Sequence, residues 1–172
     1  MTTFMEMKVA GIALDPTNNA PIVVLRDLES KYVLPIWIGI MEASAIAAAI
    51  EGIQYSRPMT HDLFKSMLES FGATIEKIEV VDIKDNVFYA TIDIDYNGAK
   101  LKIDARPSDA IAIALRTNSG IFVAGNVIRD AIQVDTSKDA AGKVVVGFEQ
   151  DKDKLKEILE KMSPEDFGKF KA

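Results

Sequence analysis

The pattern of apolar and polar positions predicts three strands between residues 5 and 38. Residues 5–9 alternate apolar with charged side chains, as in a strand with one buried face. A continuous apolar run covers residues 22–25, and strand character returns over residues 32–38. Pro35 lies in this third segment and cannot donate a backbone hydrogen bond. The third strand should therefore be an edge strand or carry a bulge.

Two helices should follow this meander. The first, about Met41 to Glu51, is rich in alanine, the best helix former, and its small side chains favour close packing or dimer formation. The second should begin at Thr60, a natural N-cap, with Asp62 in its first turn. Its apolar stripe comprises Leu63, Phe64, Met67, Leu68 and Phe71.

A second, three-stranded meander is predicted over residues 74–105, with turns at residues 85–86 and 97–98. The Asn-Gly pair at 97–98 is among the strongest short hairpin signals. The adjacent valines at 80–81 interrupt the alternation and predict a bulge. A two-residue loop at 97–98 would place two pairs of opposite charges side by side. These pairs are Asp95 with Lys100 and Asp93 with Lys102.

A third helix should begin at Pro107 or Ser108, and it is apolar on nearly every side, so it should be buried. A short strand is expected at residues 121–124, and residues 127–134 are compatible with a short helix. Beyond a polar stretch, the pattern suggests a last strand at 144–146 and a charged helix at 151–162.

These elements predict a compact single α+β domain, in which antiparallel meanders pack with two or three apolar helices. The chain of 172 residues fits one domain. We assign residues 1–135 to this domain, and residues 136–172 to a polar linker and a short C-terminal helical tail.

Composition narrows the classes of function. The chain lacks cysteine, which excludes disulfides, thiolate metal sites and cysteine nucleophiles, and suits a cytoplasmic protein. The N-terminus has no signal-peptide pattern. The longest apolar run, residues 43–50 interrupted by Ser44, is too short to span a bilayer, so no membrane partner is expected. The net charge of −6 disfavours strong electrostatic binding of nucleic acid. Any nucleic-acid contact would need a local basic patch or bound cations.

Candidate chemistry is concentrated where the second meander meets the third helix. Asp104, Arg106, Ser108 and Asp109 crowd this junction. In one interpretation, Ser108 or Asp109 caps the helix and Arg106 pairs with a carboxylate. In the other, Asp104 and Asp109 bind a hard cation such as Mg²⁺, and the planar guanidinium of Arg106 grips a phosphate.

The start of the second helix has a similar composition. Arg57 precedes His61, the single histidine of the chain, and Asp62. His61 is either an ordinary polar surface residue or a general base or phosphate contact, because its pKa lies closest to neutral pH. Glu42 either completes an acidic pocket or is a solvated end of the first helix.

Three motifs in order resemble the bifunctional nuclease (bifunctional DNase/RNase) domain family. They are residues 34–39 with Glu42 and Ala43, residues 57–63, and residues 103–112 with the core Asp-Ala-Arg-Pro-Ser-Asp-Ala. The resemblance spans about residues 5–135 and implies a compact α+β domain, often homodimeric, acting as a nuclease on DNA and RNA. The positions carried over by motif are Glu42, Arg57, His61, Asp62, Asp104, Arg106, Ser108 and Asp109.

Two functional hypotheses follow. In the first, the protein is a phosphodiester hydrolase assisted by Mg²⁺ or Mn²⁺. Its catalytic residues would be His61, Asp62, Asp104 and Asp109, its substrate-binding residues Arg57, Arg106 and Ser108, and its metal ligands Glu42, Asp62, Asp104 and Asp109. In the second, the same polar network belongs to a non-catalytic regulatory homodimer that binds an anion or nucleic acid.

Overall fold

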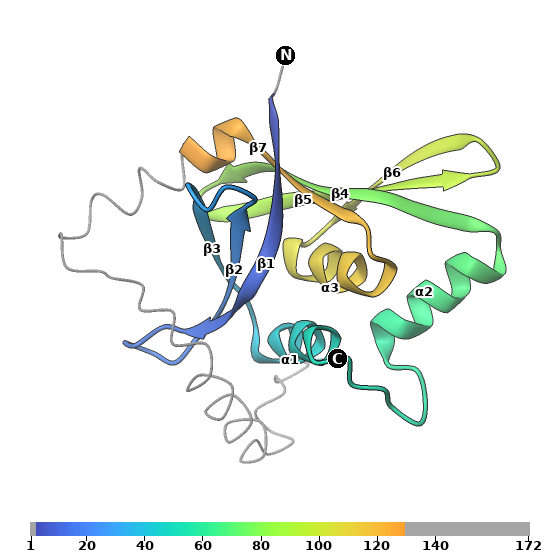
Figure 1. The fold of residues 1–172 in the computed structure, drawn as a ribbon, viewed down its shortest axis with the longest axis horizontal. Coiled ribbons are helices and arrows are strands. Elements are labelled where there is room, and N and C mark those ends of the chain that lie inside the picture. The colour runs from blue at the N-terminus through green and yellow to red at the C-terminus, as the bar shows by residue number, and fades with distance from the viewer. Residues whose placement is uncertain (1–2, 130–172) are drawn as a thin grey trace, which may run out of the picture.

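The computed structural model describes residues 3–129 of the chain (Figure 1). The linker and tail predicted for residues 136–172, with the strand at 144–146 and the helix at 151–162, lie outside the described residues. A short helix begins at Gly125 and is described as far as Arg129. The other elements are β1 (Phe4–Leu14), β2 (Pro21–Asp27), β3 (Val33–Trp37), α1 (Ile40–Ile50), α2 (Thr60–Ser70), β4 (Ala73–Lys84), β5 (Val87–Tyr96), β6 (Ala99–Ala105), α3 (Pro107–Thr117) and β7 (Gly120–Ala124).

All strands among residues 3–129 belong to one seven-stranded sheet with the order β3-β2-β1-β7-β4-β5-β6. The two predicted meanders are present, and β7 joins them because it lies between β1 and β4. It runs antiparallel to β1 and parallel to β4, so the sheet is mixed. The α+β fold class predicted from the sequence is confirmed. The joining role of β7 was not predicted, because periodicity reveals strands but not their order in a sheet.

The strand details follow local sequence chemistry. β3 is an edge strand, as Pro35 predicts. The β5–β6 loop has positive φ at both central residues, 52° at Asn97 and 83° at Gly98, as an Asn-Gly hairpin requires. The predicted bulge is present as a register shift between Val80 and Asp82.

Charged pairs occupy the sheet face opposite the helices. The predicted pairs form, with Lys100 Nζ 2.7 Å from Asp95 and Lys102 Nζ 3.2 Å from Asp93. Glu79, on β4, is buried on this face and accepts a hydrogen bond from Lys102 at 2.6 Å. Burial alone would raise the pKa of Glu79, but the bonds to Lys102 and Lys77 outweigh it and lower the pKa. These charged side chains of β4, β5 and β6 are therefore paired with one another within the sheet.

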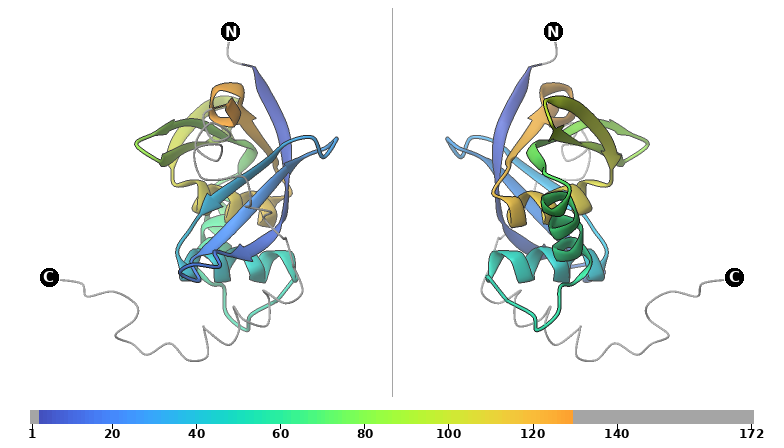
Figure 2. Two further views of the ribbon diagram at one scale, coloured as in Figure 1. Left: turned by 90° about the vertical axis from the view of Figure 1, so that its left-hand side faces the viewer. Right: turned by 90° about the vertical axis from the view of Figure 1, so that its right-hand side faces the viewer.

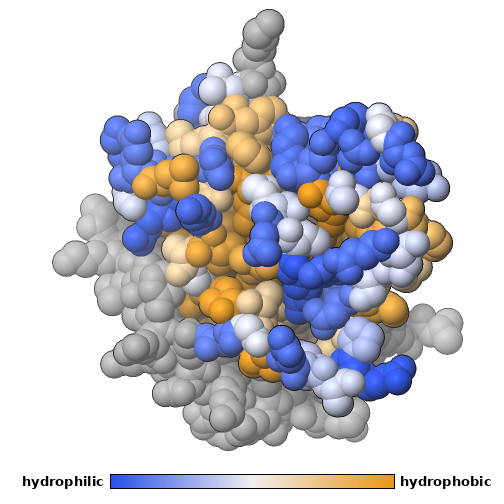
Figure 3. All heavy atoms as spheres, turned by 45° about the vertical axis from the view of Figure 1, so that its right-hand side comes forward, coloured by the Kyte–Doolittle hydropathy of each residue, from blue (hydrophilic) through white to orange (hydrophobic). Residues whose placement is uncertain are grey.

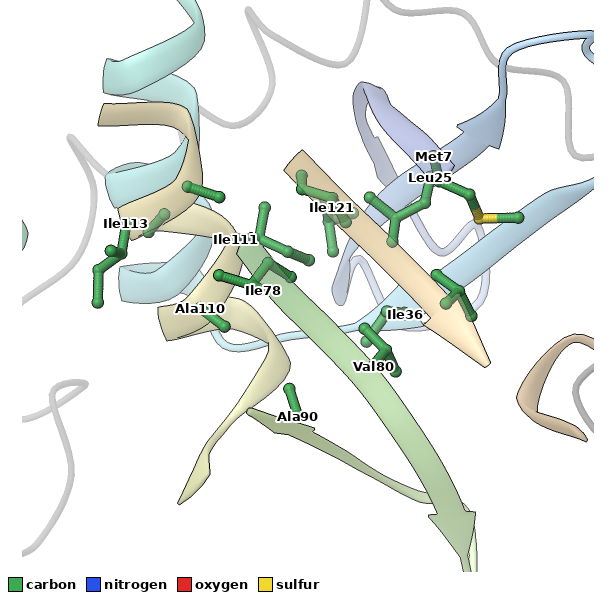
Figure 4. Close-up of a cluster of buried hydrophobic side chains, with 14 of the residues drawn as sticks. Met7, Leu25, Ile36, Ile78, Val80, Ala90, Ala110, Ile111, Ile113 and Ile121 are labelled. Carbon is green, nitrogen blue, oxygen red and sulfur yellow. The ribbon is translucent and has the colours of Figure 1, made fainter. Parts of the chain in front are cut away.

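Helix α3 is the centre of the core, as its apolar sequence predicts. Residues 110–114 are all buried. In Figure 1 α3 lies in the angle between β1–β3 and β4–β6, and the two views of Figure 2 show β1–β3 on one side of it and α2 on the other. Figure 4 shows Ala110 and Ile111 against Ile78 of β4 and Ile121 of β7. Each fully buried isoleucine contributes about 1.5–3 kcal/mol relative to exposure, so α3 is firmly anchored.

The start of α2 differs from the prediction. Thr60 is the first helical residue rather than the N-cap, which is Met59. The Asp62 carboxylate accepts a hydrogen bond from the backbone N–H of Met59 at 3.0 Å. Asp62 therefore accepts from the N-cap residue itself, a different bond from the one expected of a Thr60 N-cap, whose hydroxyl would accept from a backbone N–H inside the helix.

The apolar stripe predicted for α2 is only half used. Phe64 and Leu68 pack against the core, whereas Leu63 and Met67 are each 50% exposed and Phe71 is also exposed. Figure 3 shows hydrophobic surface in several separate areas on the side of the molecule that carries α2. The helix contacts α3 and β4 through the Phe64 and Leu68 side of the stripe, so the rest of the stripe remains at the surface.

Candidate functional site

The first turns of three helices meet at Arg106. This residue is the N-cap of α3, and its Nη1 donates to Oε1 of Glu42, in the first turn of α1, at 2.7 Å. Its Nε and Nη2 donate to the two carboxylate oxygens of Asp109 at 2.6 and 3.1 Å. His61, in the first turn of α2, has its Nε2 3.1 Å from Asp109 Oδ1. We call Glu42, Arg106, Asp109 and His61 the Arg106 network.

Local sequence explains how Arg106 comes to be paired with Asp109. Pro107 occupies the first helical position and restricts the residue before it to extended backbone, which Arg106 adopts with φ −68° and ψ 143°. Arg106 thus lies just outside α3, while Asp109 lies three residues further, in the first turn. The positive end of the helix dipole favours the Asp109 carboxylate there, and Glu42 has the same advantage in α1.

The electrostatic environment keeps Asp109 ionised. Burial would raise the pKa of its half-buried carboxyl, but hydrogen bonds from Arg106 and His61, together with their charges, lower that pKa below its ordinary value of 3.8. The hydrogen bond to Asp109 is the largest of the influences that raise the pKa of Arg106. The side chain of Arg106 is nevertheless 65% exposed, so the network opens to solvent.

Gly39 is a part of the site that sequence reasoning missed. It is the N-cap of α1, and the Glu42 carboxylate folds back against it. A Cβ at position 39 would overlap that carboxylate. Glycine is therefore required for Glu42 to adopt this position beside Arg106, and the signal in the sequence was a glycine three residues before an acidic residue at a helix start.

A second ion pair lies next to the Arg106 network. Nε of Arg116, in the last turn of α3, donates to Asp62 Oδ1 at 2.5 Å. The Arg116 side chain is only 9% exposed, and its Nη1 also donates to the carbonyl oxygens of Ala45 and Ala112. Arg116 therefore ties together all three helices. Sequence reasoning overlooked it, although an arginine near the end of a buried apolar helix needs a partner.

The same bonds set the ionisation of Asp62. Burial would raise its pKa, but the hydrogen bonds from Arg116 and from the Met59 N–H outweigh burial and lower the pKa below 3.8. Asp62 thus adjoins the Arg106 network in sequence, through His61, but is bound to a different arginine. The structure brings four of the predicted site residues into direct contact and places Asp62 beside them.

Asp104 lies apart from the Arg106 network. It pairs in register with Thr91 of β5 and is exposed. Alternation along β6 places it on the same face as Lys102, opposite the face that packs against α3. The register of the hairpin thus places Asp104 on the polar face of the sheet and separates it from Asp109, although only five positions divide them in the chain.

Ser108 and Arg57 have contrasting surroundings. Ser108 is buried, and α3 has no side-chain capping hydrogen bond, so the expected capping by Ser108 or Asp109 does not occur. Arg57 is exposed in the α1–α2 loop. Within residues 3–129 it forms no ion pair, so its charge is uncompensated there.

The carboxylates do not form an obvious metal site. Among the described residues, no group of three or more acidic or histidine side chains is arranged to hold a metal ion. Glu42 and Asp109 bind Arg106, and Asp62 binds Arg116, so guanidinium groups already compensate their charges. This donor set does not fit Mg²⁺ or Mn²⁺, which require several free oxygen ligands. A bound divalent cation stays a prediction.

Comparison with known proteins places this arrangement in a family. Residues 23–136 match the model of the bifunctional nuclease domain. The chain belongs to the bifunctional nuclease domain family. The matched range contains every residue of the Arg106 network, together with Asp62 and Arg116, so all of the geometry described above lies inside the bifunctional nuclease domain.

Relatives of the bifunctional nuclease domain extend from bacteria to plants. An uncharacterized protein of Mycobacterium tuberculosis is 38% identical over 164 residues, which cover 94% of this chain and 97% of that protein. Bifunctional nuclease 2 of Arabidopsis thaliana is 30% identical over 112 residues, which cover 62% of this chain and 34% of the plant protein. The protein of the same name from Oryza sativa is 29% identical over 107 residues, covering 60% of this chain and 33% of its own length. Among residues 3–129, no helix is long and apolar enough to cross a lipid bilayer.

Proposed function

We propose that this protein hydrolyses phosphodiester bonds of DNA, RNA or both at the Arg106 network. The observation that carries the proposal is the contact between His61 Nε2 and Asp109, whose carboxylate is held by Arg106. A histidine oriented by a carboxylate beside an exposed arginine combines a proton acceptor with an anion-binding group. Similarity to plant proteins named bifunctional nucleases supports the same reaction class.

Arg106 can bind a phosphate without releasing its carboxylate partners. A guanidinium has five N–H donors, and the bonds to Glu42 and Asp109 use one on each nitrogen. One N–H on Nη1 and one on Nη2 remain for phosphate oxygens, a bidentate arrangement that arginine favours. The first turns of α1, α2 and α3 add the positive ends of three helix dipoles. Arg57 supplies a further cation from the loop before α2.

His61 would act as the general base. When Nε2–H donates to Asp109, the neutral ring carries no proton on Nδ1, which can then accept one. Nδ1 would take a proton from a water molecule as the water oxygen attacks phosphorus. The bond from phosphorus to the leaving ester oxygen breaks, and that oxygen takes a proton from solvent. Asp109 fixes the tautomer and stabilises the imidazolium that forms.

A cleavage assay tests this proposal. Purified wild-type protein, His61→Gln and Arg106→Ala would be incubated with end-labelled single-stranded DNA and RNA, with Mg²⁺, with Mn²⁺ and with EDTA. We expect each variant to lose activity by about 10²-fold or more, the usual effect of removing a general base or an electrostatic stabiliser. The control is Asp85→Asn, in the exposed β4–β5 turn, which should cleave like wild type. Equal cleavage by wild type and both site variants would indicate a contaminating nuclease and overturn the proposal.

The second candidate is a non-catalytic regulatory homodimer that binds an anion or nucleic acid. The internal pairing of Glu42 and Asp109 with Arg106 favours it, because ion pairs of this kind can serve binding or assembly alone. The net charge of −6 favours it as well. It predicts saturable binding of oligonucleotides that Arg106→Ala weakens, with no product in any metal condition. Light scattering after size-exclusion chromatography would test the predicted homodimer.

A further inference from the structure

A small cavity lies between α2, the beginning of β4 and the end of α3. Its volume is about 190 Å³, and Leu68, Ala73 and Ile75 form an apolar wall. The volume is below the roughly 300–1,000 Å³ of sites for drug-sized ligands, so the cavity suits a group of about one ring system. It is separate from the Arg106 network, which occupies the other end of α3.

Two polar side chains in the cavity lining, those of Thr74 and Asn118, have free hydrogen-bonding capacity. Asn118 ends α3 with a left-handed φ of 55°, and among the described residues its carboxamide makes no side-chain hydrogen bond. The Thr74 hydroxyl, at the start of β4, likewise has no partner in the described part of the chain. A carboxamide offers a donor and an acceptor together, the combination found on the edge of a nucleobase.

The charges around the cavity do not favour an anion. Lys65 and Arg116 line it, but Glu69, also in the lining, pairs with Lys65 at 3.7 Å, and Asp62 pairs with Arg116. The two cations are therefore balanced by two carboxylates. The cavity also adjoins the C-terminal end of α3, where the helix dipole is negative. A neutral, planar group fits this balance better than a phosphate does.

Two residues that line the cavity connect it to the Arg106 network. Lys65 follows His61 by four residues, so both side chains lie on the same face of α2, separated by one turn of about 5.4 Å. Arg116, in the cavity wall, binds Asp62, the neighbour of His61. Asn118 follows Arg106 by twelve residues, about 18 Å along α3, so a strand with a phosphate at Arg106 could reach the cavity with a base a few nucleotides further along.

We propose that this cavity receives one unstacked nucleobase of a strand whose phosphate, a few nucleotides away, is bound at Arg106, and that it sets a base preference. The proposal rests on the function proposed above. Proteins that take a base out of the stack hold it in a snug pocket between aromatic or apolar side chains and contact its edge with hydrogen bonds. Leu68 and Ile75 would contact the faces of the base, and Asn118 would read its edge.

A titration with nucleosides tests this directly. Backbone amide signals of the ¹⁵N-labelled full chain would be followed as each of the four ribonucleosides, or inorganic phosphate, is added. We expect at least one nucleoside to shift the signals of Thr74 and Asn118, and phosphate to shift those of His61 and Arg106 only. Asn118→Gly, which keeps the left-handed backbone, should weaken nucleoside binding about three- to tenfold, the effect of one or two lost hydrogen bonds. Asn86→Gly, at another left-handed turn position, is the matched control and should bind like wild type.

The outcomes separate this inference from the proposed nuclease function. Nucleoside binding at the cavity should persist in His61→Gln, so it would stand even if no cleavage were found. If the protein cleaves, Asn118→Gly should alter the base preference a few nucleotides from the cut, through KM rather than kcat. The cavity proposal is overturned if no nucleoside shifts Thr74 and Asn118, if phosphate alone shifts them, or if Asn118→Gly leaves nucleoside binding unchanged.

Discussion

His61 and Asp109 lie 48 positions apart in the chain, yet His61 Nε2 is 3.1 Å from the Asp109 carboxylate. The contact joins the first turn of α2 to the first turn of α3. Because Arg106 holds the same carboxylate with two hydrogen bonds, His61 is oriented by a group that is itself fixed in place. Such secondary support is what keeps a catalytic side chain in one geometry.

Replacing Asp109 by asparagine should abolish most activity with little change in fold. Asparagine fits the same space, but it no longer fixes the tautomer of His61 or stabilises its charged form. We expect kcat for cleavage of labelled oligonucleotides to fall at least about 10²-fold. Asp104→Asn should keep wild-type kcat, because Asp104 lies on the opposite face of the sheet. Equal losses in the two variants would contradict the site described here.

Acid should weaken the fold through Asp62 and Asp109. Both carboxyls have pKa values below 3.8 in the folded protein, so each stabilises the fold above the unfolded pKa. That contribution is lost as the pH falls through the lower, folded pKa, which places the loss below about pH 4. Urea unfolding at pH 7 and at several pH values below 4 would measure the free energy of unfolding that is lost. The wild type should lose more stability on acidification than Asp62→Asn or Asp109→Asn, and parallel curves would argue against these ion pairs.

Arg116 should be a major contributor to stability. Arg116→Met keeps the aliphatic stem but leaves Asp62 without its partner and the carbonyls of Ala45 and Ala112 without a donor. We expect a loss of about 2–4 kcal/mol in the free energy of unfolding, measured by urea denaturation. The control is Lys65→Met in α2, because the Lys65–Glu69 ion pair is exposed and its N–O distance is 3.7 Å. This variant should change the free energy of unfolding by less than about 0.5 kcal/mol.

Gly39→Ala should act on the site through Glu42. The new Cβ would displace the Glu42 carboxylate and free Arg106 from it. Without this contact Glu42 no longer positions the Arg106 guanidinium. We therefore expect the same loss of oligonucleotide affinity from Gly39→Ala, from Glu42→Gln and from the double variant. A double-mutant cycle measures this, since residues that act through one contact have non-additive effects. Additive losses would show that Gly39 acts independently of Glu42.

Much of the strand pairing was predictable because it is local. The turn at Asn97-Gly98 fixes the register of β5 and β6, and that register gives the pairs Asp93 with Lys102 and Asp95 with Lys100. The Pro35 edge strand and the Val80 bulge follow from equally local constraints. In each case the residues concerned are close in the chain, so no knowledge of tertiary packing is needed.

The four residues of the Arg106 network were all among the positions predicted from the sequence, but their bonding partners were not predictable. The motifs point to Glu42, His61, Arg106 and Asp109, but their bonds depend on how three helices cross. That crossing is set by packing around α3, which periodicity does not encode. The same limitation hid Arg116. For Asp104 the sequence held the answer. Its closeness in the chain to Arg106 and Asp109 suggested that the three lie together, but the hairpin register places Asp104 on the sheet face away from α3.

The insertion of β7 between β1 and β4 has a consequence for how the chain folds. The two halves of the sheet cannot join until residues 120–124 have left the ribosome, because β7 is the strand that both halves pair with. Until then β1 and β4 each present an unpaired edge, which is a template for association with other chains. Folding of the complete sheet is therefore a late event in synthesis, and a nascent chain released before Gly120 should aggregate rather than form half a domain.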